Sequence, residues 1–192
     1  MDNTFDTAVV VTPAAQALLG KDVIFLGSNY FDNNWDDGLV VNSYGNISLS
    51  NVGAYSNGQN SSNGSGARLD NCDWGTDHCD SPFVKKITLT GINIFNNNYT
   101  DGLVVNASGD VSIAKLTTGN NGNNGVWVYS EAGNVLIACG SMTNNGNYGW
   151  GIELDGATKV LTLKGVFAYG NGTNTYYDLP GTTTPVETLT CP

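Results

Sequence analysis

Hydrophobic and polar residues alternate along most of this chain, and the pattern returns every 24 residues. The stretches Lys86–Leu89, Asp110–Ile113 and Asn134–Ile137 each begin an alternating segment that runs through an Asn- and Gly-rich turn into a second alternating segment. A period of two indicates half-buried β-strands, and no sustained 3.6-residue stripe predicts helices in these copies. A repeat of this length is typical of one supersecondary unit stacked on copies of itself.

Further copies extend the repeat in both directions, beginning at Asp22, Asn46 and Leu161, with a partial copy over Glu187–Thr190. The pattern therefore predicts an all-β fold, a single-stranded parallel β-helix of about six 24-residue coils and the first strand of a seventh. Stacked coils place like residues about 4.8 Å apart, which lets Asn side chains form ladders and Gly occupy turns. A disordered low-complexity chain is the alternative, but the aliphatic positions keep their register in every copy.

The first 21 residues do not follow the repeat. Thr12–Gly20 carries an N-cap residue, Pro at the first helical position and Gly after the last, which together predict a short helix. We expect residues 1–21 to form an N-terminal strand and a capping helix over the open end of the β-helix. Residues 22–192 are expected to form the β-helix. A linker turn at the same place is the alternative.

Composition narrows the possible partners. The formal net charge is −10, from 17 acidic and 7 basic residues, which argues against nucleic acid and anionic membranes. No apolar run reaches membrane-spanning length, so we expect no membrane insertion. Only 12% of residues are charged, and a surface of Asn, Ser, Thr and Gly suits polysaccharide or a second copy of this chain.

Two of the four cysteines predict a disulfide. Cys72 and Cys79 lie in a polar insertion at about residues 70–84, where a bridge would hold a loop that has little apolar surface of its own. A bridge implies an oxidising compartment, and hence an extracellular or cell-surface location. The metal alternative is weaker, since two Cys and the single His78 fall short of a zinc ligand set, and we expect His78 on the solvated surface.

The other two cysteines are not expected to be bonded to each other. Cys139 and Cys191 share a column with Gly91, but the coil that contains Gly165 lies between them. Two coils correspond to about 9.6 Å, beyond the roughly 7 Å at which two Cα atoms can be bridged. Regular stacking therefore predicts no Cys139–Cys191 bond.

Acidic residues provide the only candidate metal ligands. Asp32, Asp36 and Asp37 occupy one turn and Asp101 occupies the matching turn two coils on, in a pattern similar to a calcium loop. Gly38 stands one place late for such a loop and no Glu closes it, so a polar turn is the simpler interpretation. We expect no bound cofactor, with Ca²⁺ as the one ion that these residues suggest. No base accompanies the acids, so we expect no catalytic set and no enzyme.

Aromatic residues form a second candidate site. Trp35 and Tyr99 share a turn column, and Tyr148 and Trp150 lie close to it in the fifth coil. A row of exposed rings could stack against sugar rings. Alternatively, the rings could cap the ends of the apolar core or stack on one another between coils.

The strand–turn–Gly–strand units and Asn-rich turns resemble the right-handed parallel β-helix repeats of the pectate-lyase-like superfamily, over about residues 22–178. Lyases and hydrolases of that superfamily combine acids with a basic residue or a His, and no Arg or Lys falls in the Asp32–Asp37 or Asp101 turns. The Gly-Leu-Val-Val repeats beside Leu69–Cys72 make the chain more similar to the non-catalytic repeats of large secreted bacterial surface proteins. The resemblance implies a right-handed coil and contributes no site residues.

These observations favour an extracellular structural or adhesive module that assembles head to tail into a filament through its open ends. The assembly edge would comprise Thr188, Leu189, Thr190 and Cys191, because an unpaired strand edge invites pairing with another chain. The alternative is a carbohydrate-binding or polysaccharide-cleaving β-helix of lyase or hydrolase type.

Overall fold

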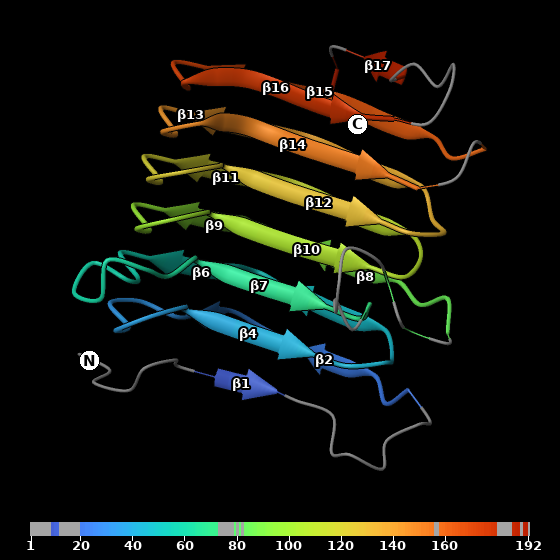
Figure 1. Cartoon of the computed structure of the whole chain (residues 1–192), viewed down its shortest axis with the longest axis horizontal. Coiled ribbons are helices and arrows are strands. Elements are labelled where there is room, and N and C mark those ends of the chain that lie inside the picture. The colour runs from blue at the N-terminus through green and yellow to red at the C-terminus, as the bar shows by residue number, and fades with distance from the viewer. Residues whose placement is uncertain are drawn as a thin grey trace.

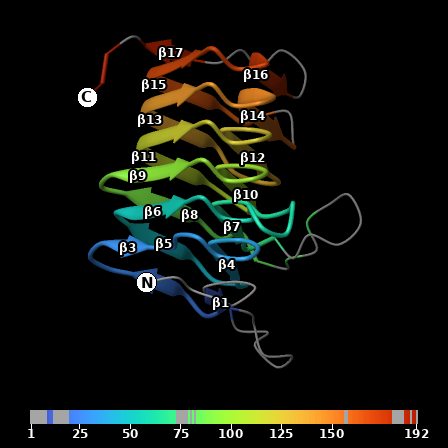
Figure 2. The same cartoon turned by 90° about the vertical axis from the view of Figure 1, so that its left-hand side faces the viewer.

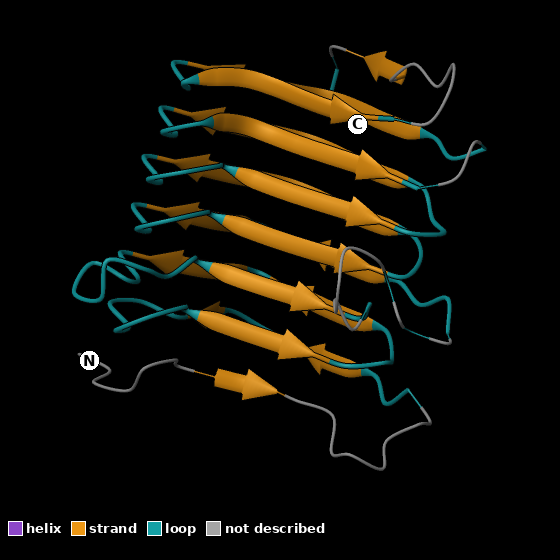
Figure 3. Cartoon of the chain, viewed as in Figure 1, coloured by secondary structure: helices purple, strands orange, loops and turns teal. Residues whose placement is uncertain are grey.

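The protein is a right-handed parallel β-helix in a computed structural model, which describes residues 9–11, 20–72, 79, 81, 83–155, 158–179, 186–188, 190 and 191 (Figure 1). Every regular element in this part of the chain is a strand, which confirms the all-β prediction (Figure 3). The predicted capping helix at 12–19 lies outside the described residues. Within them, no helix is long and apolar enough to cross a membrane.

Two parallel sheets and a short third face build the coils. Sheet A consists of β1 (Val9–Val11), β4 (Leu39–Asn42), β7 (Ala67–Asp70), β10 (Leu103–Ala107), β12 (Val126–Ser130), β14 (Tyr148–Leu154) and β16 (Thr173–Asp178). Sheet B consists of β2 (Val23–Phe25), β5 (Ile47–Ser50), β8 (Ile87–Thr90), β11 (Val111–Gly119), β13 (Val135–Thr143), β15 (Leu161–Tyr169) and β17 (Val186–Thr188). The third face begins with β3 (Asn29–Tyr30), β6 (Val52–Tyr55) and β9 (Asn93–Asn96) and continues in the second halves of the long sheet B strands (Figure 2).

Strand pairing confirms the predicted period. Val111 pairs with Ile87 on one side and with Val135 on the other, so successive coils are 24 residues apart. The step from β5 to β8 is longer, 40 residues, because the insertion that contains Cys72 and a longer turn after Asn57 both leave the β-helix between them.

Inward side chains form one continuous apolar core. Strand residues alternate between buried and half-exposed positions, as the sequence pattern predicts, and the inward columns stack Leu, Ile and Val on like residues. The sheet B columns, for example, contain the fully buried Ile87, Leu89, Ile113 and Ile137. Burial of such aliphatic side chains contributes about 1.5–3 kcal/mol each.

A buried asparagine ladder runs through the corner that leads into sheet A. Each side-chain amide nitrogen donates to the side-chain oxygen of the Asn in the next coil at 2.8–3.0 Å, in the order Asn34, Asn57, Asn98, Asn121, Asn145 and Asn171. The backbone N–H of each of the first five donates to the same oxygen at 2.8–3.2 Å. Each of these oxygens thus satisfies two donors of the neighbouring coil.

The ladder also reaches back to the main chain. The Asn57 amide nitrogen donates to the Phe31 carbonyl at 2.8 Å, and Asn121 donates to Phe95 in the same way at 2.9 Å. These carbonyls belong to the preceding coil, so Asn57 and Asn121 each connect three successive coils. Because the corner is buried, no water is available to replace these bonds.

One prediction about the cysteines is confirmed and one is wrong. Cys72 and Cys79 form the predicted disulfide, with Cα atoms 4.8 Å apart. Contrary to the register argument, Cys139 and Cys191 are also bridged, and their Cα atoms are 5.1 Å apart.

The path of the chain after the last strand explains the error. β17 pairs Val186 with Thr162, whereas the predicted alignment placed Glu187 beside Leu161. The chain beyond β17 approaches Gly165, where an added Cβ would lie 2.8 Å from the Cys191 amide nitrogen. Since Gly165 has no side chain, Cys191 comes within reach of Cys139 past the intervening coil.

The final coil ends the core with polar groups. Thr175 and Tyr177 of β16 pair with the inward Trp150 and Ile152, and Glu187 of β17 pairs with the inward Leu163. The Tyr177 hydroxyl donates to the Glu187 carboxylate at 3.3 Å. Burial, with the adjacent Glu187 charge, raises the pKa of Tyr177 to about 12, so this hydroxyl keeps its proton at neutral pH.

Replacing a central residue of the asparagine ladder should destabilise the whole β-helix. In Asn98→Ala, the buried donors of Asn57 lose their acceptor and the Asn121 oxygen loses its side-chain donor, although the backbone N–H at position 98 can still donate to it. We expect a loss of about 3 kcal/mol, measured by urea unfolding. The exposed Asn60→Ala is the matched control and should change stability by less than about 0.5 kcal/mol. Equal stability of the two variants would contradict a structural role for the ladder.

The second disulfide should hold only the last coil. In a Cys139→Ser, Cys191→Ser variant, amide hydrogen exchange should accelerate in β17, because three exposed residues pair weakly with β15. We expect local opening to become easier by about 2–4 kcal/mol. The Cys72→Ser, Cys79→Ser variant is the control and should leave β17 protected. Unchanged exchange of β17 in both variants would show that the bond is dispensable.

Candidate functional site

Three of the four candidate metal ligands are engaged within the protein, whereas one buried oxygen of the fourth, Asp36, has no hydrogen-bond partner among the described residues. The Asp32 carboxylate accepts the Tyr55 amide, and Asp37 accepts the Ser65 amide and lies 3.9 Å from the Arg68 guanidinium. Asp101 accepts three hydrogen bonds, from the side chains of Asn123 and Asn124 and the Asn124 amide.

The same acids do not converge on an ion. Asp37 and Asp101 share an outward column but are separated by the coil of Ser65. Burial raises the pKa of both carboxyls, and hydrogen bonds and the Arg68 charge partly offset this. Within the described ranges no group of three or more His, Cys, Asp or Glu side chains could hold a metal. This turn is therefore a hydrogen-bonded structural corner.

In the structure the predicted aromatic residues do not form a single row. Trp35 and Tyr99 do share a column, in the position after each ladder Asn, and both are exposed, at 49% and 43%. Glycines occupy this column in the other coils, so the two rings stand alone there. Trp150 points inward and is only 6% exposed, which removes it from any exposed stacking surface.

Three other rings gather on the outer face of sheet A. Trp127 and Tyr176 are stacked, with centroids 5.4 Å apart and planes inclined by 18°. Tyr148 is tilted against both, at 6.1 Å from Trp127 and 5.3 Å from Tyr176. All three side chains are half-buried, and we call this cluster the aromatic patch. Of its members only Tyr148 was a candidate from the sequence.

A glycine makes room for the aromatic patch. Trp127, Gly151 and Tyr176 follow one another in one outward column of β12, β14 and β16. A Cβ on Gly151 would lie 2.3 Å from two carbons of the Trp127 ring. The indole therefore lies flat across the Gly151 backbone and meets Tyr176 from the next coil. Any side chain at this position would lift the indole away from the sheet.

Carboxylates occupy the next outward column. Glu153 pairs with Asp178 across β14 and β16, and Tyr129 of β12 precedes them in the same column. The Tyr129 hydroxyl donates to the Glu131 carboxylate. Burial raises the pKa of Tyr129, and the bond to Glu131 and nearby acidic charges add to this effect. The aromatic patch therefore has an acidic, hydrogen-bonding border on one side.

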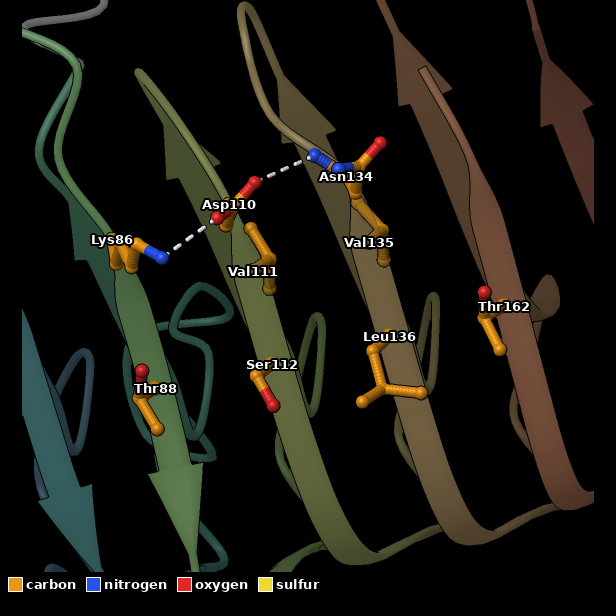
Figure 4. Close-up of a pocket in the computed structure, with 9 residues that line it drawn as sticks. All are labelled: Lys86, Thr88, Asp110, Val111, Ser112, Asn134, Val135, Leu136 and Thr162. Carbon is orange, nitrogen blue, oxygen red and sulfur yellow. Dashed lines mark hydrogen bonds and ion pairs between the residues drawn. The ribbon is translucent and has the colours of Figure 1, made fainter.

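The outer face of sheet B has a shallow groove of about 400 Å³ (Figure 4). One side of it is a chain of interactions in which Lys86 pairs with Asp110 at 2.9 Å and Asp110 accepts the Asn134 amide. These two contacts hold the pKa of Asp110 below its usual value. The floor carries small or aliphatic side chains, Thr88, Ser112, Leu136 and Thr162. Since its charged groups already satisfy one another, this groove offers less for a ligand than the aromatic patch.

The proposed assembly edge is only partly defined. Thr188 pairs with Lys164 in β15, and Cys191 is bonded to Cys139. Thr190 is exposed, and Leu189 lies outside the described residues. Among the described strands, β16 is the outermost of sheet A at this end, and the sequence did not single it out.

The fold and the exposed rings define a parallel β-helix with an aromatic surface on one sheet. Comparisons of the chain with protein-family models, with curated proteins and with solved structures found no match.

Proposed function

We propose that this chain is an extracellular adhesive module that binds polysaccharide through the aromatic patch on sheet A. Three half-exposed rings within 5.3–6.1 Å of one another carry this proposal. Aromatic faces attract the C–H faces of pyranose rings, and adjacent carboxylates accept hydrogen bonds from sugar hydroxyls. Both are present on three consecutive coils.

The two disulfides support the extracellular location. Such bonds form and persist in oxidising compartments and are rare in the cytosol. The β-helix fold also agrees with the resemblance to non-catalytic repeats of secreted bacterial surface proteins. A rigid stack of coils presents its side chains in fixed columns, which suits recognition of a repeating polymer.

Head-to-tail assembly is a second candidate, favoured by the arrangement of the outermost described strands. β1 and β16 are the two outer strands of sheet A, and β2 and β17 are those of sheet B. In a second copy stacked in phase, β1 would pair with β16 and β2 with β17, so that both sheets continue. The polar ends of the core columns at Tyr177 and Glu187 oppose this contact, because they do not need an apolar cover.

Binding should depend on the shape of the aromatic patch. We expect Trp127→Ala to weaken binding of cellohexaose or N-acetylchitohexaose by about 10-fold or more, measured by calorimetry. Gly151→Ala should have a similar effect while keeping every ring, because its Cβ would displace the indole. Tyr169→Ala, on another face, is the matched control and should bind as the wild type does. Absence of oligosaccharide binding by the wild type would reject this function.

Assembly should depend on the free edge of β16. The backbone N–H of Thr173 donates to the backbone carbonyl of Asn147 in the preceding coil. Because successive backbone N–H groups of a strand point to opposite sides, the backbone N–H of Asn174 points towards the open edge. If assembly occurs, Asn174→Pro should abolish the large species in sedimentation velocity, whereas Asn174→Ala should retain them. Only monomers in the wild type at high concentration would reject head-to-tail assembly.

A further inference from the structure

The acids beside the aromatic patch have no cationic partner. The outward residues of β12, β14 and β16 are Trp127, Tyr129, Gly151, Glu153, Tyr176 and Asp178, which include no Lys or Arg. Glu131 and Asp155 follow directly after β12 and β14. Four carboxylates therefore border three rings, and no ion pair among the described residues neutralises them.

At the opposite end of the same face, by contrast, the acids do have a cation nearby. There Arg68 stands in the outward column between Val40 and Val104, 3.9 Å from the Asp37 carboxylate, and its charge also acts on Asp101. Acids at that end are thus partly neutralised by a cation of the protein itself. At the aromatic end the corresponding column positions hold rings and a glycine. The Lys159 ammonium donates to the Ala132 carbonyl beside Glu131, which leaves Glu153 and Asp178 as the acids without a cation nearby.

Glu153 and Asp178 pair in register on adjacent strands, about 4.8 Å apart. Burial, and then the charge of Asp178, raises the pKa of Glu153. Like charges so placed destabilise one another, and a cation placed between them relieves both the repulsion and the desolvation. The rings begin two residues along the strands, about 7 Å away, which is close to the dimensions of one sugar unit.

Resting on the proposed polysaccharide function, we propose that the aromatic patch and its acidic border select a cationic amino-sugar polymer, such as a deacetylated glucosamine chain. The pyranose ring stacks on Trp127 and Tyr176, and its ammonium group pairs with Glu153 and Asp178. Charge complementarity excludes uronic-acid polymers, since their carboxylates would meet four acids with no cation between them. A basic peptide would satisfy the charge, but it offers no flat C–H face for the stacked rings.

The experiment compares hexamers of glucosamine, N-acetylglucosamine and glucose with hexalysine, by calorimetry at pH 5.5 in 20 mM and 500 mM NaCl. At low salt the glucosamine hexamer should bind at least about 10-fold more tightly than the N-acetylated hexamer, because each ammonium adds charge-assisted hydrogen bonds. High salt should reduce this preference. Trp127→Ala should weaken binding of both hexamers.

Removal of the two charges tests the residues themselves. Glu153→Gln with Asp178→Asn should bring the affinities of the glucosamine and N-acetylglucosamine hexamers to within about threefold of each other. Asp32→Asn with Asp36→Asn removes the same charge far from the patch and should keep the preference. Circular dichroism would check that each variant retains the β-helix.

The outcomes separate the two proposals. Equal affinity for glucosamine, N-acetylglucosamine and glucose hexamers would overturn the amino-sugar inference and leave the carbohydrate function standing. Hexalysine that binds as tightly as the glucosamine hexamer, without dependence on Trp127, would also overturn it, in favour of a basic peptide. If no hexasaccharide binds, both proposals fail.

Discussion

The fold depends on one interaction more than on any other, the hydrogen bond between successive asparagine amides in the corner that leads into sheet A. A parallel coil must turn at this corner with its backbone buried, and a buried N–H without a partner destabilises the fold by about 1–3 kcal/mol. From Asn57 onwards, each ladder oxygen accepts both the backbone and the side-chain N–H of the Asn in the coil before it, for example at Asn98. The ladder therefore satisfies the turn and sets the position of each coil above the last.

The columns of the outer face follow from that alignment. Because adjacent coils cannot slip at the ladder, residues at equivalent positions in β12, β14 and β16 stand directly above one another. The aromatic patch consists of residues from three coils that are far apart in sequence, and it needs a column in which Gly151 lies between two rings. A slip of one residue would turn these rings into the core. Fold and candidate site thus rest on the same register.

Much of the architecture was predictable, since a 24-residue period and a two-residue alternation are both visible in the sequence. The shared column of Trp35 and Tyr99 was predictable for the same reason. Trp150 was assigned to the surface although it lies two residues before Ile152, in phase with the inward positions of β14. The two-residue alternation alone therefore indicates that Trp150 points inward. The outward column that joins Trp127 and Tyr176 through Gly151 could have been found by the same count.

Other features depended on local geometry that no period conveys. The Cys139–Cys191 bond requires the chain beyond β17 to leave the strand register and pass close to Gly165. Stacking of Trp127 against Tyr176 requires an indole lying flat over a bare backbone, which depends on side-chain rotamers as well as on columns. Regular stacking predicts where Cα atoms lie. It does not predict where a side chain leans or where a terminal segment departs from the coil.

The two proposed functions meet in β16. This strand supplies Tyr176 to the aromatic patch and Asp178 to its acidic border, and it also presents the open edge of sheet A. Stacking of a second copy on that edge would add outward columns above Tyr176 and lengthen the face available to a polymer. A polymer bound along several stacked copies would gain affinity through effective concentration without any new contact. Adhesion and assembly would then reinforce each other, whereas the polar pair of Tyr177 and Glu187 would keep the association of the copies weak in the absence of such a polymer.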